Sequence, residues 1–210
     1  SVSIYNQTSY LTRMQALEFK IFGGLFQVGR SYWGAAFMGG NGQFNRMSAL
    51  ESVASEEGPW SHYLTEDQEL GLRLLQRGWT GEHEPYTDVN QQGVNNLKKL
   101  YRQRTRWMQG NLEVIKDMQR LYSHHLTGIR RFDAMFTLIQ PALQIIVGLS
   151  VILSLILWIG FGIPYLPLNN IWLLLFFLQL SVGPTFLGIS VIARGKGIQG
   201  VGLVLKYAFP

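Results

Sequence analysis

The sequence predicts a mixed α/β domain followed by transmembrane helices, and the distribution of charge is the first observation behind this prediction. Half of the 18 Lys and Arg residues lie between Lys98 and Arg131. Residues 134–193, by contrast, contain no Asp, Glu, Lys or Arg. Because one helical crossing of a bilayer needs about 20 apolar residues, this uncharged stretch is long enough to cross twice.

The uncharged stretch divides at residues 160–164, where glycines and a proline are typical of a loop. We therefore expect a membrane domain over residues 132–210, with spans at about 142–160 and 171–193 and a truncated third segment at 198–210. Two buried core helices are the alternative. A run of 23 apolar or uncharged residues is, however, hard to bury in a domain this small.

Basic residues on both sides of the predicted spans indicate their orientation. Arg130 and Arg131 precede the first span, and Arg194 and Lys196 follow the second, while the loop between the spans carries no charge. The positive-inside rule then places residues 1–131 in the cytoplasm. The sequence therefore predicts a multi-pass protein of the cell membrane whose soluble part is cytoplasmic.

The soluble part alternates helical periodicity with turn residues. We expect a helix over 8–29, an apolar run over 35–38 that ends in a tight turn at 39–42, regular structure over 44–50, a loop over 56–61, a helix over 65–78, an extended segment over 80–89 and a long helix over 95–122. Too few strands are predicted to close a sheet. We therefore expect the missing strands upstream and interpret the chain as a fragment.

The residue inventory excludes several kinds of chemistry. The chain has no cysteine, which excludes a disulfide framework, a thiolate nucleophile and a cysteine-based metal site. Its histidines, which include the adjacent pair His124 and His125, form no pattern to which we assign a metal.

Thr65-Glu66-Asp67 stands at the start of the helix predicted over 65–78. The plainer interpretation is capping, because Thr65 suits the N-cap, Gln68 follows three residues on as in a capping box, and acids favour the first turn. Capping and catalysis are compatible. A helix N-terminus holds a carboxylate in a fixed direction and keeps it ionised at neutral pH, which is the state that a general base needs.

Gln103, Arg106, Trp107 and Gly110 share one face of the long helix, at about 100° per residue. This face presents an amide, a guanidinium group, a flat ring and a gap where a ligand can approach. The guanidinium fork matches a diphosphate, and an indole ring stacks on the apolar face of a sugar.

Membrane contact is the alternative for the same helix. Trp107 would then be an interfacial aromatic anchor. The basic residues that would meet anionic lipid headgroups are Lys98, Lys99, Arg102, Arg104, Arg120, Arg130 and Arg131. Both interpretations stay open for this helix taken alone.

Gly39-Gly40-Asn41-Gly42-Gln43-Phe44 is a glycine-rich turn, and glycines let a backbone approach a ligand closely. It lacks the Gly-Lys-Ser/Thr ending of a phosphate loop and the dinucleotide spacing. Taken alone, a plain turn explains it.

The order of these motifs, a glycine turn, Thr-Glu-Asp, Gln-x-x-Arg-Trp and then membrane helices, resembles the membrane-bound family 2 glycosyltransferases. These include the cellulose, chitin, hyaluronan and poly-N-acetylglucosamine synthases. The resemblance covers about residues 8–195. It implies that residues 1–131 are the carboxy-terminal part of a cytoplasmic GT-A glycosyltransferase domain with interfacial helices.

The resemblance also implies roles for individual residues. Asp67, with Glu66 beside it, would be the catalytic base, taking the proton of an acceptor hydroxyl while that oxygen attacks the anomeric carbon, so that the configuration inverts. Gln103 and Arg106 would hold the nucleoside diphosphate, and Trp107 would stack beneath the acceptor sugar. The acceptor-site loop would comprise Gly40, Asn41, Gly42 and Gln43.

The implied partners are a nucleotide sugar, a polysaccharide or lipid acceptor and membrane lipids, with no nucleic acid. A divalent metal, Mg or Mn, is expected in the full-length enzyme. The family's Asp-x-Asp metal pair precedes the glycine turn, and no Asp-x-Asp occurs in this sequence. The metal ligands are therefore expected outside this chain, and the fragment alone should be inactive.

Three functions remain open from the sequence. The first is transfer of sugar from a nucleotide sugar, a UDP-sugar, to a growing β-linked polysaccharide. The second is transfer of one sugar to a diacylglycerol-type lipid, because the turn followed by Arg46 and Ser48-Ala49-Leu50 also resembles bacterial glucosyltransferases of that kind. The third is a non-enzymatic, membrane-anchored basic binding domain.

Overall fold

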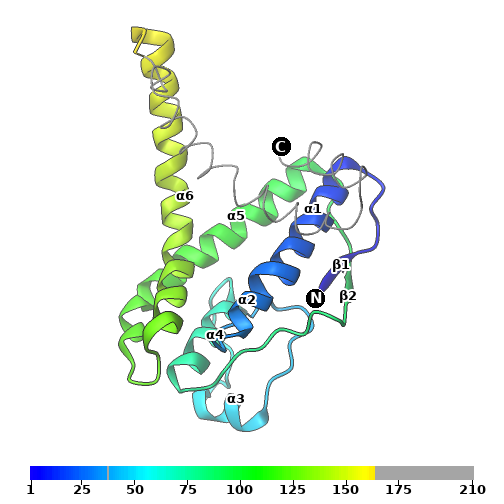
Figure 1. Cartoon of the computed structure of the whole chain (residues 1–210), viewed down its shortest axis with the longest axis vertical. Coiled ribbons are helices and arrows are strands. Elements are labelled where there is room, and N and C mark those ends of the chain that lie inside the picture. The colour runs from blue at the N-terminus through cyan, green and yellow to red at the C-terminus, as the bar shows by residue number, and fades with distance from the viewer. Residues whose placement is uncertain (37, 164–210) are drawn as a thin grey trace. The chain divides into compact units, whose positions relative to one another are not determined.

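The computed structural model describes residues 1–36 and 38–163, which divide into a first unit, Ser1–Ala142, and the beginning of a second, Leu143–Pro210. Helices dominate both (Figure 1). The elements are, in order, β1 (Val2–Ile4), α1 (Tyr10–Ile21), the π-helix η1 (Phe22–Gln27), α2 (Val28–Ser31), α3 (Met47–Val53), α4 (Glu66–Gln76), β2 (Val89–Gln91), α5 (Leu97–Val114), the 3-10 helix η2 (Ile115–Tyr122) and α6 (Gly128–Phe161).

The helix predicted over 8–29 is confirmed as the continuous helical segment α1–η1–α2. A capping box begins it: the Ser9 hydroxyl accepts from the Thr12 amide at 3.2 Å, and the Ser9 amide donates to the Thr12 hydroxyl at 3.0 Å. The π-helical middle, which contains Gly23 and Gly24, was not predicted. Such widened turns occur where local packing departs from the regular helix.

Among the described residues, the sheet has two strands, β1 and β2, which pair in parallel with Val2 opposite Val89 and Ile4 opposite Gln91. The expectation of too few strands for a closed sheet therefore holds for this part of the chain. β1 was not predicted, because three residues are too short for a period-2 pattern. The predicted extended segment over 80–89 forms one isolated bridge, Gly81 to Ala35, before β2 begins.

Helix α4 confirms the helix predicted over 65–78: Thr65 is its N-cap residue, and Gly78 follows its end with φ +90°. Its leucines pack in two directions. Leu72 belongs to one buried cluster, with Val114 of α5 and Leu138 of α6, and Leu70 belongs to another, with Val53 of α3. Burying such a side chain contributes about 1.5–3 kcal/mol. Packing on two sides fixes where the amino-terminal end of α4 lies.

The long helix predicted over 95–122 is α5 followed by the 3-10 helix η2. Asn96 caps α5 by accepting from the Lys99 amide at 3.1 Å. Figure 1 shows α5 running alongside α1, and a bidentate ion pair joins the two helices, with Arg104 donating to Glu18 at 2.7 and 2.6 Å.

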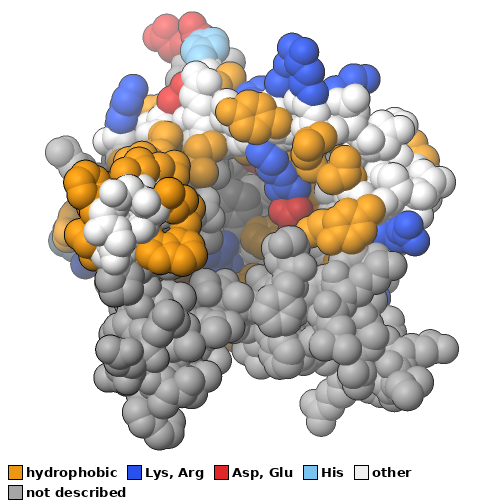
Figure 2. Space-filling view, turned by 90° about the horizontal axis from the view of Figure 1, so that it is seen from above, with side chains coloured by type: hydrophobic (Ala, Val, Ile, Leu, Met, Phe, Trp, Pro, Cys, Tyr) orange, Lys and Arg blue, Asp and Glu red, His pale blue; other side chains and the backbone are white. Residues whose placement is uncertain are grey.

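Helix α6 contains the first predicted span, about 142–160, and is longer than that span: it begins at Gly128 and continues through Pro141. A proline inside a helix removes one backbone hydrogen bond, and membrane helices tolerate this. Beyond residue 142, many hydrophobic side chains of α6 are exposed, and Figure 2 shows such side chains gathered around the end of the helix. By length and composition, α6 is the single helix in residues 1–163 that could cross a membrane.

The second predicted span, 171–193, and the third segment, 198–210, lie outside the described residues. The basic pair before α6 is described, and its guanidinium groups bond within the protein. Arg130 donates to the Trp79 carbonyl at 2.8 Å, and Arg131 donates to the Leu126 carbonyl at 2.7 Å. The expectation that these two groups meet lipid headgroups is corrected to this extent.

Candidate active site

Asp67 is the second residue of α4 and is half-buried. Its Oδ1 accepts from the Gln68 amide at 2.8 Å. Burial raises the pKa of Asp67 above its ordinary value, because desolvation outweighs the opposing hydrogen bond from Gln68, and the neighbouring Glu66 charge adds to the rise. The expectation that the helix N-terminus keeps this carboxylate ionised at neutral pH stays a prediction.

Thr65 occupies the N-cap position, but its side chain makes no capping hydrogen bond, so the expected capping box with Gln68 is not formed. The Thr65 hydroxyl is instead buried without a partner among the described residues. The reason is its backbone, since φ −120° and ψ 65° depart from the extended geometry of a capping residue. Glu66 is exposed.

The glycine turn lies directly against the Asp67 carboxylate. Gly40 has φ +76°, and a Cβ built on it would stand 3.2 Å from Asp67 Oδ2. One helical turn further along α4, a Cβ on Gly71 would stand 3.1 Å from the Met38 sulfur. Two glycines thus let the segment that carries the turn approach α4 closely.

The same turn also contacts β2. The Asn41 side-chain amide donates to the Gln91 side-chain carbonyl at 2.5 Å. Gly42, at φ +64°, faces the Val89 side chain so closely that a Cβ there would overlap it. Gln43 is half-buried, and its side-chain oxygen has no partner among the described residues.

Helix α5 meets the start of α4 at Gly110. A Cβ on Gly110 would stand 2.6 Å from Thr65 Cγ2 and 2.9 Å from the Thr65 nitrogen. The gap expected at Gly110 for a ligand is therefore filled by Thr65, and this prediction was wrong. The glycine serves close helix packing, and Glu113 supports the contact by accepting from the Leu64 amide at 3.5 Å.

Gln103, Arg106 and Trp107 lie within two turns of Gly110 on α5. Trp107 precedes Gly110 by three residues, a rise of about 4.5 Å at 1.5 Å per residue. Gln103 and Trp107 are half-buried and Arg106 is exposed. The contact at Gly110 therefore places the end of α5 that carries these side chains beside the start of α4.

Arg104 covers one face of the Trp107 ring, with its guanidinium carbon 4.6 Å from the ring centroid. Its ion pair with Glu18 fixes that guanidinium group in place. Within the protein, the charge of Arg104 is therefore paired with Glu18 as well as lying over the indole ring.

Two cavities in residues 1–163 are lined by neither Asp67 nor Trp107. One is lined by Arg30 and Asp133, which form an ion pair at 3.1 Å, together with Gln68 and Gly71 of α4. The other follows the face of α5 that contains Met108 and Leu112. The structure brings the motif-bearing elements together, and a cleft between Asp67 and Trp107 stays a prediction.

The described residues do not fit a metal centre, since no group of three or more His, Asp or Glu side chains gathers anywhere in them. No step of the chemistry is therefore derived through a metal. Of the residues that join the site, sequence reasoning missed Gly71, Gln91 and Glu113. Gly71 alone carried a signal, as a glycine inside a predicted helix.

Two curated relatives are glycosyltransferases by name. The chain is 34% identical over 93 residues to the beta-monoglucosyldiacylglycerol synthase of Trichormus variabilis, and the match covers 44% of this chain and 19% of that protein. It is 28% identical over 99 residues to the UDP-forming cellulose synthase catalytic subunit of Komagataeibacter sucrofermentans, covering 47% and 13%. The matches thus span about a fifth of these relatives or less.

No solved structure matches the chain significantly. A family model described as "Glycosyl transferase family group 2" matches residues 1–183, which is most of the chain. That match includes the glycine turn, the Asp67 segment and α5 together. The chain therefore belongs to glycosyl transferase family group 2, and with it to the GT-A class of nucleotide-sugar transferases.

Proposed function

We propose that this protein transfers a sugar from a nucleotide sugar, a UDP-sugar, to an acceptor hydroxyl with inversion at the anomeric carbon, and that Asp67 is the general base. The observation that carries the proposal is the position of the Asp67 carboxylate. It lies where the glycine turn meets the start of α4. Asp67 follows Thr65 by two residues, and Thr65 contacts Gly110 of α5.

The proposed step needs one proton acceptor and one leaving-group site. Asp67 takes the proton of the acceptor hydroxyl while that oxygen forms a bond to the anomeric carbon. The bond from the anomeric carbon to the diphosphate oxygen breaks, and its electron pair leaves with the nucleoside diphosphate. The raised pKa of Asp67 supports this role, because a more basic carboxylate accepts a proton more readily and a general base works best with a pKa near the working pH.

We assign the diphosphate to Gln103 and Arg106 and the acceptor to Trp107 and the glycine turn. An exposed guanidinium group suits paired hydrogen bonds to phosphate oxygens. The indole face opposite Arg104 suits the apolar face of a sugar, and Arg104 would hold the ring in place for stacking. Glu66 is exposed, and we propose that it acts on Asp67 through its charge.

The acceptor we propose is a growing β-linked polysaccharide, as the name of the cellulose synthase relative suggests. A glycolipid product is the second candidate, and the higher identity to the beta-monoglucosyldiacylglycerol synthase favours it. Family membership supports either enzyme over a non-enzymatic anchor. In both cases we propose that residues 1–131 are cytoplasmic and that residues 132–210 are the membrane domain.

The test is the product formed by membranes that carry the full-length enzyme, supplied with radiolabelled UDP-sugar. Asp67→Asn should lower transfer by about 100-fold or more, the usual scale of general-base catalysis. Asp88→Asn, which changes an exposed aspartate, is the control and should transfer normally. Normal turnover by Asp67→Asn would end the proposal. Label retained as a large polymer favours the first acceptor, and label extracted into organic solvent favours the second.

A further inference from the structure

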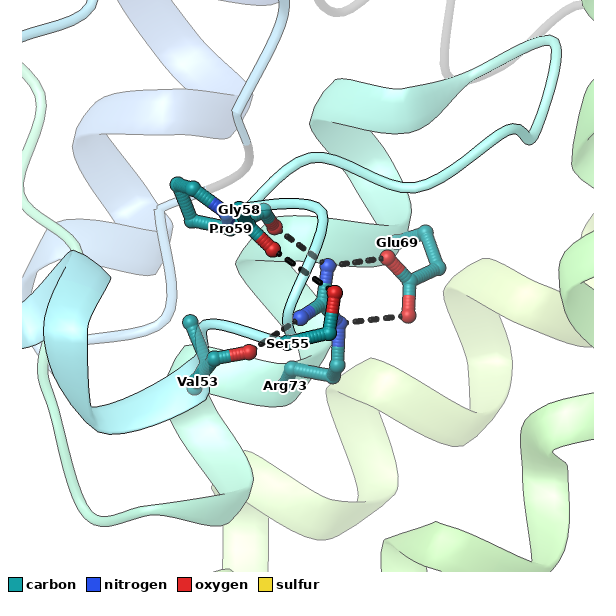
Figure 3. Close-up of polar contacts among 6 residues, drawn as sticks. All are labelled: Val53, Ser55, Gly58, Pro59, Glu69 and Arg73. Carbon is teal, nitrogen blue, oxygen red and sulfur yellow. Dashed lines mark hydrogen bonds and ion pairs between the residues drawn. The ribbon is translucent and has the colours of Figure 1, made fainter.

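One arginine of α4 holds two points of the connection between α3 and α4. Arg73 of α4 makes a bidentate ion pair with Glu69, through Nε to Oε1 at 2.6 Å and Nη2 to Oε2 at 2.7 Å. The same guanidinium group donates through Nη1 to the Val53 carbonyl and through Nη2 to the Pro59 carbonyl, each at 2.7 Å. Figure 3 shows these groups converging on Arg73. We call Glu69, Arg73 and these two carbonyls the arginine cluster.

The arginine cluster differs from an ordinary pair on a helix surface. A spacing of four residues usually gives an exposed ion pair that contributes a few tenths of a kcal/mol. Here the Glu69 side chain is 3% exposed and that of Arg73 is 19% exposed. A buried carboxylate needs its partner, so Glu69 fixes the guanidinium group, and the guanidinium group fixes the two carbonyls.

The two carbonyls belong to the start and the middle of the connection between α3 and α4. Val53 is the last residue of α3, and Pro59 follows a tight turn in which the Ser55 amide donates to the Gly58 carbonyl at 2.9 Å. The chain then runs only from Trp60 to Leu64 before it reaches Thr65. Where that short segment enters α4 is therefore set by the arginine cluster.

The start of α4 depends on this support because its own cap is missing. The Thr65 hydroxyl makes no capping bond, and Asp67 itself accepts from the Gln68 amide. The Ser61 hydroxyl on the entering segment is also buried without a partner among the described residues. The hydrogen bond from Gln68 holds the Asp67 carboxylate to its own helix, so the direction of the first turn relative to the rest of the protein depends on packing at Gly40 and Gly110 and on the arginine cluster.

We propose that Arg73 is a positioning residue for Asp67: by fixing the Val53 and Pro59 carbonyls against α4, it sets the direction in which the carboxylate meets the acceptor hydroxyl. The inference rests on the proposed function, because it assigns to Arg73 a role in a reaction in which Asp67 is the base. It goes beyond that function by extending the machinery to a residue that touches no substrate.

The experiment compares Arg73→Lys with Arg77→Lys in membranes of the full-length enzyme. Lysine keeps the charge beside Glu69, but its single ammonium group does not reproduce the planar fork that reaches four oxygens. Arg77 is exposed at the end of the same helix, so its variant is a matched control. Turnover is normalised to nucleotide-binding sites and measured well below the unfolding temperature.

We expect kcat of Arg73→Lys to fall at least tenfold, since a misplacement of about 1 Å in an active site can cost about 100-fold. KM for the UDP-sugar should stay within about twofold, and Arg77→Lys should match the wild type. The double variant Glu69→Gln with Arg73→Gln leaves no unpaired charge. It should likewise show a lower kcat and an almost unchanged KM. A purely structural role would instead lower the number of binding sites and leave turnover per site unchanged.

Three outcomes would overturn the proposal: normal kcat per site in Arg73→Lys, an equal loss in Arg77→Lys, or unfolding of both cluster variants, which would assign the arginine cluster to the fold alone. Asp67→Asn is measured in parallel. If it turns over normally, the proposed function fails. If it is inactive while Arg73→Lys is normal, only the inference about Arg73 fails.

Discussion

Helices α4 and α6 both contain leucines, but those of α4 that pack in the core are buried, whereas most of those of α6 beyond residue 142 are exposed. Leu70 and Leu72 of α4 are buried against other parts of the protein, whereas Leu149 and Leu153 of α6 are more than half exposed. Apolar surface of that extent needs a covering, and the charge-free length of α6 suits a bilayer. The comparison teaches that α4 is fixed by protein packing on two sides, which is what a catalytic carboxylate at its end requires.

The largest effect on the fold should come from Leu70→Ala. Leu70 is fully buried, and truncating such a leucine typically costs about 2–5 kcal/mol through lost contacts and the cavity left behind. The matched change in α6, Leu153→Ala, removes an exposed side chain and should leave the stability of the first unit unchanged. Chemical denaturation followed by Trp fluorescence measures both, and equal losses would break the comparison.

Gly110→Ala should have the next largest effect, because the added methyl group would meet Thr65 at 2.6 Å. Overpacking of this kind costs about 1–3 kcal/mol, and it would push α5 away from the start of α4. We expect a clear loss of transfer. Gly148→Ala in α6, where a Cβ meets nothing within 4 Å, is the control and should retain activity. Full activity in Gly110→Ala would show that transfer does not need the close packing of α5 against the start of α4.

Glu18→Gln should have a smaller effect. It breaks the partly exposed ion pair with Arg104, and exposed pairs contribute about 0.2–1 kcal/mol. Because Arg104 also covers Trp107, we expect KM for the acceptor to rise a fewfold while the folded fraction is unchanged. High salt should weaken the wild type in the same direction and leave the variant unaffected. If the variant has the KM of the wild type, Arg104 has no role in acceptor binding.

The smallest effect concerns Asp67 and pH. A carboxyl group whose pKa is raised in the folded state contributes stability that is full below its unfolded pKa and is lost as pH rises through the folded value. Asp67→Asn removes this dependence. The variant should therefore be slightly more stable than the wild type at neutral pH, with the difference vanishing in acid. Thermal unfolding at several pH values measures this difference in stability. A difference that grows in acid would contradict a raised pKa of Asp67.

Local patterns predicted the helices well and the contacts between them poorly. The residue patterns that predict α4 and α5 each lie within one short stretch of sequence, so both helices were predicted along with the motifs that they carry. Gly110 was placed on the correct face, but its neighbour Thr65 lies 45 residues earlier, and nothing in the spacing indicated that it fills the gap.

The charged residues show the same limit. From sequence, lipid headgroups were the only partners considered for Arg104 and Arg131, as one of two open interpretations, whereas folding brings each a partner within the protein: Glu18 for Arg104 and the Leu126 carbonyl for Arg131. Arg73 was not singled out at all, because its role depends on two backbone carbonyls that no residue pattern encodes. Side-chain identity predicts chemistry, and tertiary packing decides which side chains are available for it.

The contact between α4 and α5 can be measured directly, because the 210 residues contain no cysteine. In a variant with Thr65→Cys and Gly110→Cys, the two introduced Cβ atoms would lie within the reach of a disulfide, which needs about 3.5–4.5 Å. Mild oxidation of membranes should join the two peptides, as detected by mass spectrometry, while Thr65→Cys with Gly29→Cys should stay unlinked, because a Cβ at Gly29 meets nothing within 4 Å. Failure of the first pair to link while the protein remains folded would contradict the convergence of α5 on the Asp67 segment.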